Sequence, residues 1–361
     1  QAGNALPTWR GQNEQTMAHT AIAYAKAKKR TRAMAVTSSI GPGATNMVTA
    51  AALAHVNRLP VLLIPGDVFA NRAPDPVLQQ VEDFDDGTVS ANDCFRPVSR
   101  YFDRISRPEH LLTALPRAFR TMTDPADCGP VCLSFCQDVQ AEAYDWPEAF
   151  FAPRIWQTRR PRPDEGELAR VADLLKAAKS PVIVAGGGVH YAGACAALQR
   201  FAEAHQIPVV ESQAGKSALA WDHPLNLGPV GVTGAGSANE VCAGADLVLG
   251  VGTRFQDFTT GSWTAFAHDA QLIAVNAARH DAGKHRSLPV VGDAKLSLGA
   301  LDAALDYTAP PDWVGFAQDE RKKWDGYVAE NVAHGNRPNS YAQAIGVVNE
   351  LCDPRDRVVA A

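Results

Sequence analysis

A carboxylate and a glycine-rich turn near the start of the chain are the residues whose types and spacing could do chemistry. Glu14 lies at the start of an alanine-rich helical pattern, GQNEQTMAHTAIAYA at residues 11–25. A glutamate in a first helical turn usually caps the helix or offsets its dipole. A carboxyl packed against apolar groups instead has a raised pKa and can hold a proton. Residues 40–46, IGPGATN, follow an apolar strand pattern and precede a second helix, but they lack the GxxxxGK(S/T) spacing of a P-loop.

Three cysteines recur every four residues, as they would around a metal ion: Cys128, Cys132 and Cys136. The surrounding GPVCLSFC has the pattern of a buried strand, along which residues four apart lie about 13 Å apart. Two thiolates at that distance cannot share a zinc ion, whose bonds to sulfur are about 2.3 Å long. We therefore expect these thiols to serve packing.

Other polar side chains are expected to have ordinary structural roles. His19 follows Glu14 closely on the same helix and could face the same site, but a packed or solvent-facing role is favoured. No spacing argues for a metal at His190, His280 or His285. A short acidic segment could line a polar pocket or bind a cation, and a solvated loop is its default structure; its carboxylates are Glu82, Asp83, Asp85 and Asp86.

Composition excludes several classes of protein. The net charge of −5 gives no basic footprint for a nucleic acid. No stretch reaches the roughly 18 apolar residues that a membrane span needs, and seven cysteines without a secretory signal favour a reducing, cytoplasmic compartment. Because the chain starts with Gln1 and ends in an apparent strand, we expect it to be a fragment.

Strand and helix patterns alternate along the chain, which predicts an α/β protein with two doubly wound parallel-sheet domains and the start of a third. The expected bounds are 1–150 and 164–307 for the domains, 151–163 and 308–338 for linkers, and 339–361 for the third unit. Expected helices cover 13–28, 44–57, 108–123, 164–178, 192–205, 294–305 and 340–351. Expected strands cover 33–38, 61–66, 130–136, 181–187, 207–212, 246–252, 271–276, 288–293 and 357–361.

The second domain carries AGGGVHYAG at residues 185–193, between a strand and a helix. The dinucleotide fingerprint GxGxxG fails there, because Tyr191 occupies the place of the third glycine. Glu211 ends the next strand, where a ribose-binding acid would lie. An NAD-binding dehydrogenase is therefore retained only as an alternative from another functional class.

Four ordered segments of the first domain resemble the pyrimidine-binding domain of thiamine diphosphate enzymes of the acetohydroxyacid synthase type. They are GQNEQTMAH, AVTSS, GPGATN and LPVLLIPGDV. The resemblance implies that Glu14 bonds the cofactor's pyrimidine ring as a carboxylic acid of raised pKa, and that Gly41, Pro42 and Gly43 lie near the cofactor. The turn TSSIGPG is longer than the family's TSGPG.

Segments of the second domain resemble the family's central domain, which has a dinucleotide-type fold and binds FAD in some members. They are PVIVAGGGV, IPVVES with Lys216 shortly after it, DHPLNLGPVG and ADLVLGVGTRF. The resemblance identifies 1–150 as an N-terminally incomplete pyrimidine-binding domain and 339–361 as the beginning of a diphosphate-binding domain. Nothing in this sequence requires FAD.

Longer stretches resemble one branch of the family, the trihydroxycyclohexanedione hydrolases of inositol catabolism. They include LPTWRGQNEQTMAHTAIAYAKAKKR, VLQQVEDFDDGTVSANDCFRPVSRYFDRI and GTRFQDFTTGSW. The resemblance implies thiamine diphosphate-dependent hydrolysis of a carbon–carbon bond in a polyhydroxylated cyclic diketone, giving 5-deoxyglucuronate.

The same resemblance implies Mg²⁺ and diphosphate ligands in a third domain beyond this chain, with no metal ligand here, and a homo-oligomer, dimer or tetramer, that completes each site. The fragment alone is then expected to be inactive. An acetohydroxyacid synthase-like carboligase acting on 2-oxo acids and a non-catalytic protein with a degraded thiamine fold remain as alternatives.

Overall fold

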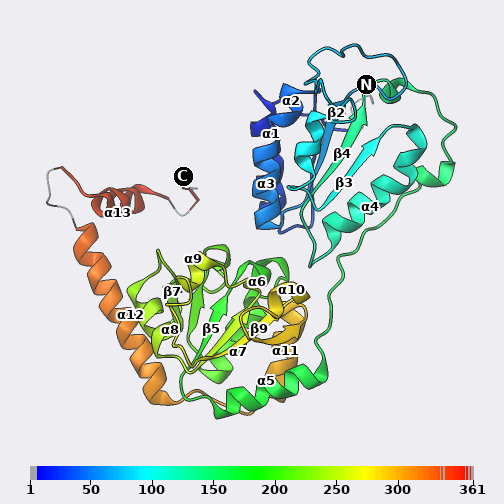
Figure 1. Ribbon diagram of the computed structural model, residues 1–361. Helices are drawn as coiled ribbons and strands as arrows, with labels where there is room; N and C mark the ends of the chain where they lie inside the picture. Colours follow the sequence, from blue (N-terminus) through cyan, green and yellow to red (C-terminus); the bar gives the residue numbers. More distant parts are fainter. Residues whose placement is uncertain (1–5, 334, 336–337, 354, 357, 359–361) are drawn as a thin grey trace. The chain divides into compact units, whose positions relative to one another are not determined.

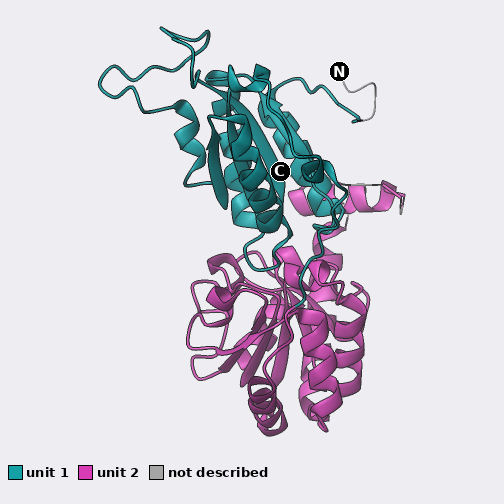
Figure 2. Cartoon of the chain, turned by 90° about the vertical axis from the view of Figure 1, so that its right-hand side faces the viewer, with its two compact units in different colours: residues 1–160 teal, residues 161–361 magenta. Residues whose placement is uncertain are grey.

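The computed structural model describes residues 6–333, 335, 338–353, 355, 356 and 358. Two compact units divide the chain: unit 1, Gln1–Arg160, and unit 2, Pro161–Ala361 (Figure 2). Each unit has its own parallel sheet with helices between successive strands (Figure 1). This confirms the predicted α/β class with two parallel-sheet domains.

Unit 1 is built on a four-stranded sheet of order β1-β2-β4-β3, in which every pairing is parallel. The two central strands are apolar and buried almost throughout, as parallel strands covered on both faces are. Its strands are β1 (Ala35–Ser38), β2 (Val61–Asp67), β3 (Tyr101–Ile105) and β4 (Pro130–Cys136). Its α-helices are α1 (Glu14–Ala27), α2 (Pro42–Thr45), α3 (Val48–Asn57) and α4 (Leu111–Thr123).

Small side chains let the helices of unit 1 approach each other closely. The buried face of α1 is mainly alanine, with Ala18, Ala21 and Ala25, and the buried residues of α3 are all alanines. The two helices contact each other in the fold. The predicted small-residue face of the first helix therefore packs as expected, and it fixes where the start of α1 lies relative to β1.

Unit 2 is built on a six-stranded parallel sheet of order β10-β9-β8-β5-β6-β7, whose strand order reverses at β5. Helices α5, α7 and α11 pack with one face and α8 and α12 with the other. Its strands are β5 (Pro181–Ala185), β6 (Val209–Glu211), β7 (Asn226–Pro229), β8 (Leu247–Val251), β9 (Gln271–Asn276) and β10 (Leu288–Val291). These helices are α5 (Glu165–Ala177), α7 (Cys195–His205), α8 (Gly236–Gly244), α11 (Ala294–Ala304) and α12 (Pro311–Val332).

Several elements differ from the sequence prediction. Strands β3 and β7 were not predicted, because β3 mixes charged and apolar residues and β7 is short, with glycine and proline. The expected linker at 308–338 instead contains the long helix α12. Its Trp313 donates a hydrogen bond from Nε1 to the Pro181 carbonyl at 2.9 Å, so this segment packs on the sheet.

The C-terminal part of the structure ends with one further helix, α13 (Tyr341–Leu351), where a helix was predicted. The strand predicted at 357–361 lies almost wholly outside the described residues. None of the described helices combines the length and the apolar character that crossing a bilayer requires.

Candidate functional site

Glu14 is the first residue of α1 and lies at the carboxyl edge of the unit 1 sheet, beside the turn that follows β1. The preceding residue, Asn13, caps the helix by accepting a hydrogen bond from the Thr16 backbone N–H at 2.9 Å. Glu14 itself is half-buried, and its Oε2 accepts a hydrogen bond from Asn46 Nδ2 at 2.9 Å. Asn46 ends α2, so this bond joins the start of α1 to the end of the glycine-rich turn.

Each of the three predicted turn residues has a different structural role, and Gly43 lies beside the Glu14 carboxyl. A Cβ on Gly43 would lie 3.4 Å from Glu14 Oε1 and would overlap the Ser39 hydroxyl, so the absence of a side chain keeps the space beside Oε1 clear. Gly41 has φ +64°, and a Cβ there would overlap the carbonyl oxygen of Gln79. Pro42 begins α2, where its fixed φ suits a first helical residue.

The ionisation of Glu14 differs from the sequence prediction. We expected burial to raise its pKa, but the Asn46 amide, followed by its own backbone N–H, lowers the pKa of this carboxyl. The apolar residues of α1 lie further along the helix, and the carboxyl at its start is too exposed for desolvation to dominate. Glu14 in this chain is therefore a carboxylate at neutral pH.

Two buried carboxylates hold the long segment between β2 and β3 in place next to this turn. Asp67 ends β2 and is fully buried. It accepts hydrogen bonds from Ser90 Oγ and Ser134 Oγ, both at 2.5 Å, and from Arg104 Nε at 2.8 Å. These three donors satisfy the buried carboxylate oxygens of Asp67.

Asp138 follows β4 and holds the beginning of the same segment. Its carboxylate accepts the backbone N–H groups of Ala70, Asn71 and Arg72 at 2.9, 2.7 and 3.0 Å. Burial raises the pKa of Asp138, but these N–H groups outweigh it, so the net shift is downward. Because Gln79 of the same segment contacts Gly41, the two carboxylates fix backbone that lies directly against the candidate site.

Sequence reasoning did not single out Asn46, Asp67 or Asp138 as site residues. Asn46 directly follows the glycine-rich turn, and the two aspartates stand in IPGD and FCQD at or just after the ends of buried strands. A polar side chain at the carboxyl end of a parallel strand is the signal that could have found them.

The remaining predicted polar groups have structural positions. His19 is half-buried on α1. The acidic residues of the segment 82–86 are exposed, and Asp83 accepts hydrogen bonds from the backbone N–H groups of Asp85 and Asp86. Burial raises the pKa of Cys128 and of Cys136 to about 11, which leaves both thiols protonated. Within the described ranges, no three His, Cys, Asp or Glu side chains converge as a metal site would require.

The glycines after β5 in unit 2 are explained by close packing of backbone. A Cβ on Gly188 would lie 2.6 Å from Gly252 Cα, and one on Gly186 would overlap the Gly252 carbonyl. Glu211 is buried and accepts a hydrogen bond from the Leu219 backbone N–H at 3.3 Å. These contacts account for the glycines and for the acid without a bound dinucleotide.

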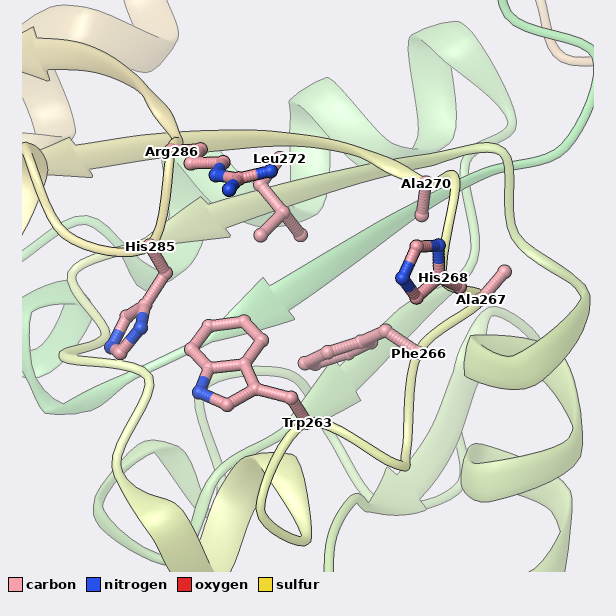
Figure 3. A pocket seen from close by; sticks show the side chains of 8 residues that line it. All are labelled: Trp263, Phe266, Ala267, His268, Ala270, Leu272, His285 and Arg286. Carbon is pink, nitrogen blue, oxygen red and sulfur yellow. The ribbon is translucent and has the colours of Figure 1, made fainter.

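Unit 2 also has an open aromatic pocket of about 280 Å³ that the sequence did not predict. Figure 3 shows Trp263 and Phe266 along one side, with His285 beside the indole and Arg286 near Leu272. The rings of Trp263 and His285 are 4.0 Å apart between centroids. The pocket lies within unit 2 alone and includes none of the residues around Glu14.

Comparison with known families matches both units. Residues 4–86 match the family described as "Thiamine pyrophosphate enzyme, N-terminal TPP binding domain". Residues 168–301 match the one described as "Thiamine pyrophosphate enzyme, central domain". Thiamine pyrophosphate is the same compound as thiamine diphosphate, and Glu14 and the turn after β1 lie within the first match.

Curated relatives with the name 3D-(3,5/4)-trihydroxycyclohexane-1,2-dione hydrolase are similar to most of the chain. The identity is 50% over 305 residues for Geobacillus thermodenitrificans and 49% over 302 residues for Clostridium perfringens. These alignments cover 84% and 83% of this chain but 48% and 47% of the relatives, so the chain spans about half of their length. The chain belongs to the thiamine pyrophosphate enzyme family, of which it carries the N-terminal TPP binding domain and the central domain.

Proposed function

We propose that this chain serves a thiamine diphosphate-dependent hydrolase that opens trihydroxycyclohexane-1,2-dione to 5-deoxyglucuronate in the degradation of myo-inositol. The observation that carries the proposal is the Glu14 carboxylate beside the side-chain-free Gly43, inside the matched TPP binding domain. Relatives that are about half identical and bear the name of this hydrolase support the choice of substrate.

The residues present fit the ring end of the cofactor. Gly43 leaves backbone without a side chain next to Glu14 Oε1, where a flat heterocycle can approach the chain. Asn46 holds Oε2, which orients the carboxyl and leaves Oε1 directed toward the space beside Gly43. When bound, thiamine diphosphate supplies the carbon nucleophile that carbon–carbon cleavage needs.

Glu14 then holds a proton at Oε1 toward a ring nitrogen. In the uncovered chain the Asn46 amide favours the carboxylate. If a bound cofactor covered Glu14, exclusion of water would disfavour the charged form and raise the pKa of the carboxyl. The same residue therefore changes from carboxylate to carboxylic acid as the site is covered, and Asn46 keeps it in one orientation throughout.

We further propose that Mg²⁺ and the diphosphate are held outside the two described units and that a second copy of the protein completes the site in a homo-oligomer, dimer or tetramer. The matches to the N-terminal and central domains support the first part, because enzymes of this family hold these groups in a further domain. The exposed apolar side chains Leu53 and Val56 on α3, beside α1, support the second. Free cysteines throughout support a cytoplasmic location.

The direct test offers the cyclic diketone and pyruvate separately to the holoenzyme, with thiamine diphosphate and Mg²⁺ present. The proposal expects ring-opened acid from the diketone and no acetolactate from pyruvate. Acetolactate formation without turnover of the diketone would assign the acetohydroxyacid synthase-like alternative instead.

A further inference from the structure

Four basic side chains gather at the edge of the unit 1 sheet where its strands begin. Arg30, Arg58 and Arg100 precede β1, β2 and β3, and His55 lies in the last turn of α3. All four strands are parallel, so their amino ends lie along one edge of the sheet. Glu14 and the turn after β1 lie at the opposite edge of the sheet, where the strands have their carboxyl ends.

Backbone contacts bring these residues together from distant parts of the chain. Arg30 donates a hydrogen bond from Nη2 to the carbonyl of Asn57, the residue before Arg58, at 3.2 Å. The His55 ring lies close to the backbone of Val98, two residues before Arg100. The basic residues therefore form two adjoining pairs rather than a scattered surface charge.

Arg100 is fixed at the centre of this group. Its backbone N–H donates to the Pro130 carbonyl at 2.8 Å, and a Cβ on Gly129 would lie 2.5 Å from Arg100 Cγ. The stem of Arg100 thus occupies the space that Gly129 leaves at the start of β4. A substitution of Gly129 would displace it.

Two titratable groups, His55 and Cys128, lie within reach of these positive charges. After burial, the nearby charges of Arg100 and Arg58 lower the pKa of His55. Burial raises the pKa of Cys128 to about 11, and the charges of Arg30, Arg100 and Arg58 oppose that rise. Three guanidinium groups therefore share one small region around Cys128.

Several polar atoms in this region are shielded from water and have no hydrogen-bond partner among the described residues. They include Arg100 Nε, Ser99 Oγ and His55 Nδ1. Asp124 also acts on Cys128, but its Oδ1 already accepts the backbone N–H groups of Ala126 and Asp127. Shielded donors of this kind normally have a partner, either protein, water or ion.

A simpler explanation covers only part of the group. Arg30 and Arg58 follow the ends of α1 and α3 with φ of +62° and +53°, and cations are favoured near helix C-termini. The same explanation covers His55 in the last turn of α3, but it does not cover Arg100, which precedes β3 and follows no helix end.

We propose that Arg100, His55 and Ser99, with the charges of Arg30 and Arg58, form a binding site for a phosphate-type oxyanion at the amino edge of the unit 1 sheet. Guanidinium groups present paired donors that match phosphate oxygens. The proposal goes beyond the function proposed above and does not depend on it, because it concerns the other edge of the sheet.

The test labels arginines of the protein with phenylglyoxal and maps the modified peptides, with inorganic phosphate or chloride at equal ionic strength. At a phosphate concentration ten times its Kd, labelling of Arg100 should slow about tenfold by mass action. Exposed Arg170 on α5 should react equally in both salts. Equal labelling of Arg100 in both salts would overturn the proposal without any variant.

Variants provide a second readout. In wild type, phosphate should raise the melting temperature more than chloride does, and Arg100→Met should abolish that difference while Arg170→Met retains it. If Arg100→Met does not fold, Arg100→Lys replaces it, and loss of the paired donors should still weaken phosphate binding. A phosphate-dependent shift that survives in Arg100→Lys and in His55→Gln alike would contradict the assignment. The same experiment with glucose 6-phosphate distinguishes free phosphate from a phosphorylated metabolite.

Discussion

In each unit, a glycine-rich turn follows the first strand. The two turns differ in which atoms a Cβ added to a glycine would contact. In unit 1, a Cβ on Gly43 would meet the side-chain oxygens of Ser39 and Glu14. In unit 2, the three atoms nearest to a Cβ on Gly188 would all be backbone atoms of Gly252. In the first turn, the glycine lies beside polar side-chain atoms. In the second turn, the glycine lets two backbone segments pack directly against each other. Only the first has the geometry of a binding site.

The helices α1 and α5 show the same contrast. Both begin with a glutamate directly after an Asx N-cap, Asn13 or Asp164. Glu14 accepts a hydrogen bond from Asn46, whereas Glu165 is exposed. Glutamate at a helix start is therefore uninformative by itself, and Glu165 is a matched control for Glu14.

The largest expected effect follows from the pair of glutamates. In the holoenzyme, Glu14→Gln should lower kcat for ring opening by about 10²–10⁴-fold, because the amide cannot hold and release a proton. Glu165→Gln should leave kcat unchanged. Steady-state kinetics on the two variants side by side measures the difference, and similar kinetics for both would remove the distinction between the two helix starts.

The pair of glycines should respond in opposite ways. Gly43→Ala should abolish most cofactor binding while costing about 1.5 kcal/mol of stability or less, because the Ser39 side chain can rotate away. Gly188→Ala should cost about 1–3 kcal/mol, since its Cβ would lie 2.6 Å from backbone that cannot move easily. Cofactor titration and denaturant unfolding of both variants measure these two effects. A loss of stability in Gly43→Ala but not in Gly188→Ala would contradict the prediction.

Asp138 and Asp164 extend the comparison to carboxylates that hold backbone. Asp138→Asn should cost about 1–3 kcal/mol at pH 7, since several N–H groups lose a charged acceptor. The folded pKa of Asp138 is depressed, so its stabilisation is present above the unfolded pKa of about 3.9 and is lost as pH falls through the lower folded pKa. The difference in the free energy of unfolding between wild type and Asp138→Asn should therefore become smaller below about pH 4.

The matched change Asp164→Asn should be close to neutral, because asparagine and aspartate are similarly good N-caps. Urea unfolding from pH 3 to pH 7 measures both variants. If the difference in the free energy of unfolding between wild type and Asp138→Asn stays constant over this pH range, the charge of Asp138 does not hold the segment between β2 and β3.

The smallest expected effect is on the titration of Glu14 itself. Asn46→Ala removes the hydrogen bond that lowers the pKa of Glu14, so this pKa should rise in the cofactor-free protein. Carboxyl-carbon NMR titration measures it. Thr45→Ala, one residue earlier, is the control and should leave the Glu14 titration unchanged.

Much of this fold follows from local patterns that the sequence displays. The buried strands and their following helices are apolar runs with the expected period, and the α/β class and the two sheets were predicted from them. Strand β3 was not predicted, because Asp103 and Arg104 interrupt its apolar pattern. The partner of Arg104, Asp67, is 37 residues away and is brought near only by the folded sheet. Helix α12 was not predicted, because its tryptophans contact β5 and α8, which are distant in the sequence.

The site was predictable in its residues but not in its electrostatics. Glu14 and the turn 41–43 could be selected from type and spacing, whereas the bond from Asn46 joins residues 32 positions apart. That bond reverses the expected direction of the Glu14 pKa. A charge state depends on three-dimensional neighbours, which a linear pattern does not contain.

Hydrogen–deuterium exchange at the thiazolium C2 of the cofactor bound to the holoenzyme tests the central claim most directly, because it reports the proton chemistry of Glu14 without the substrate. Exchange should be about 10²-fold slower or more in Glu14→Gln than in wild type, with Glu165→Gln unaffected. An unchanged exchange rate in Glu14→Gln, with the cofactor fully bound, would contradict the assignment of Glu14.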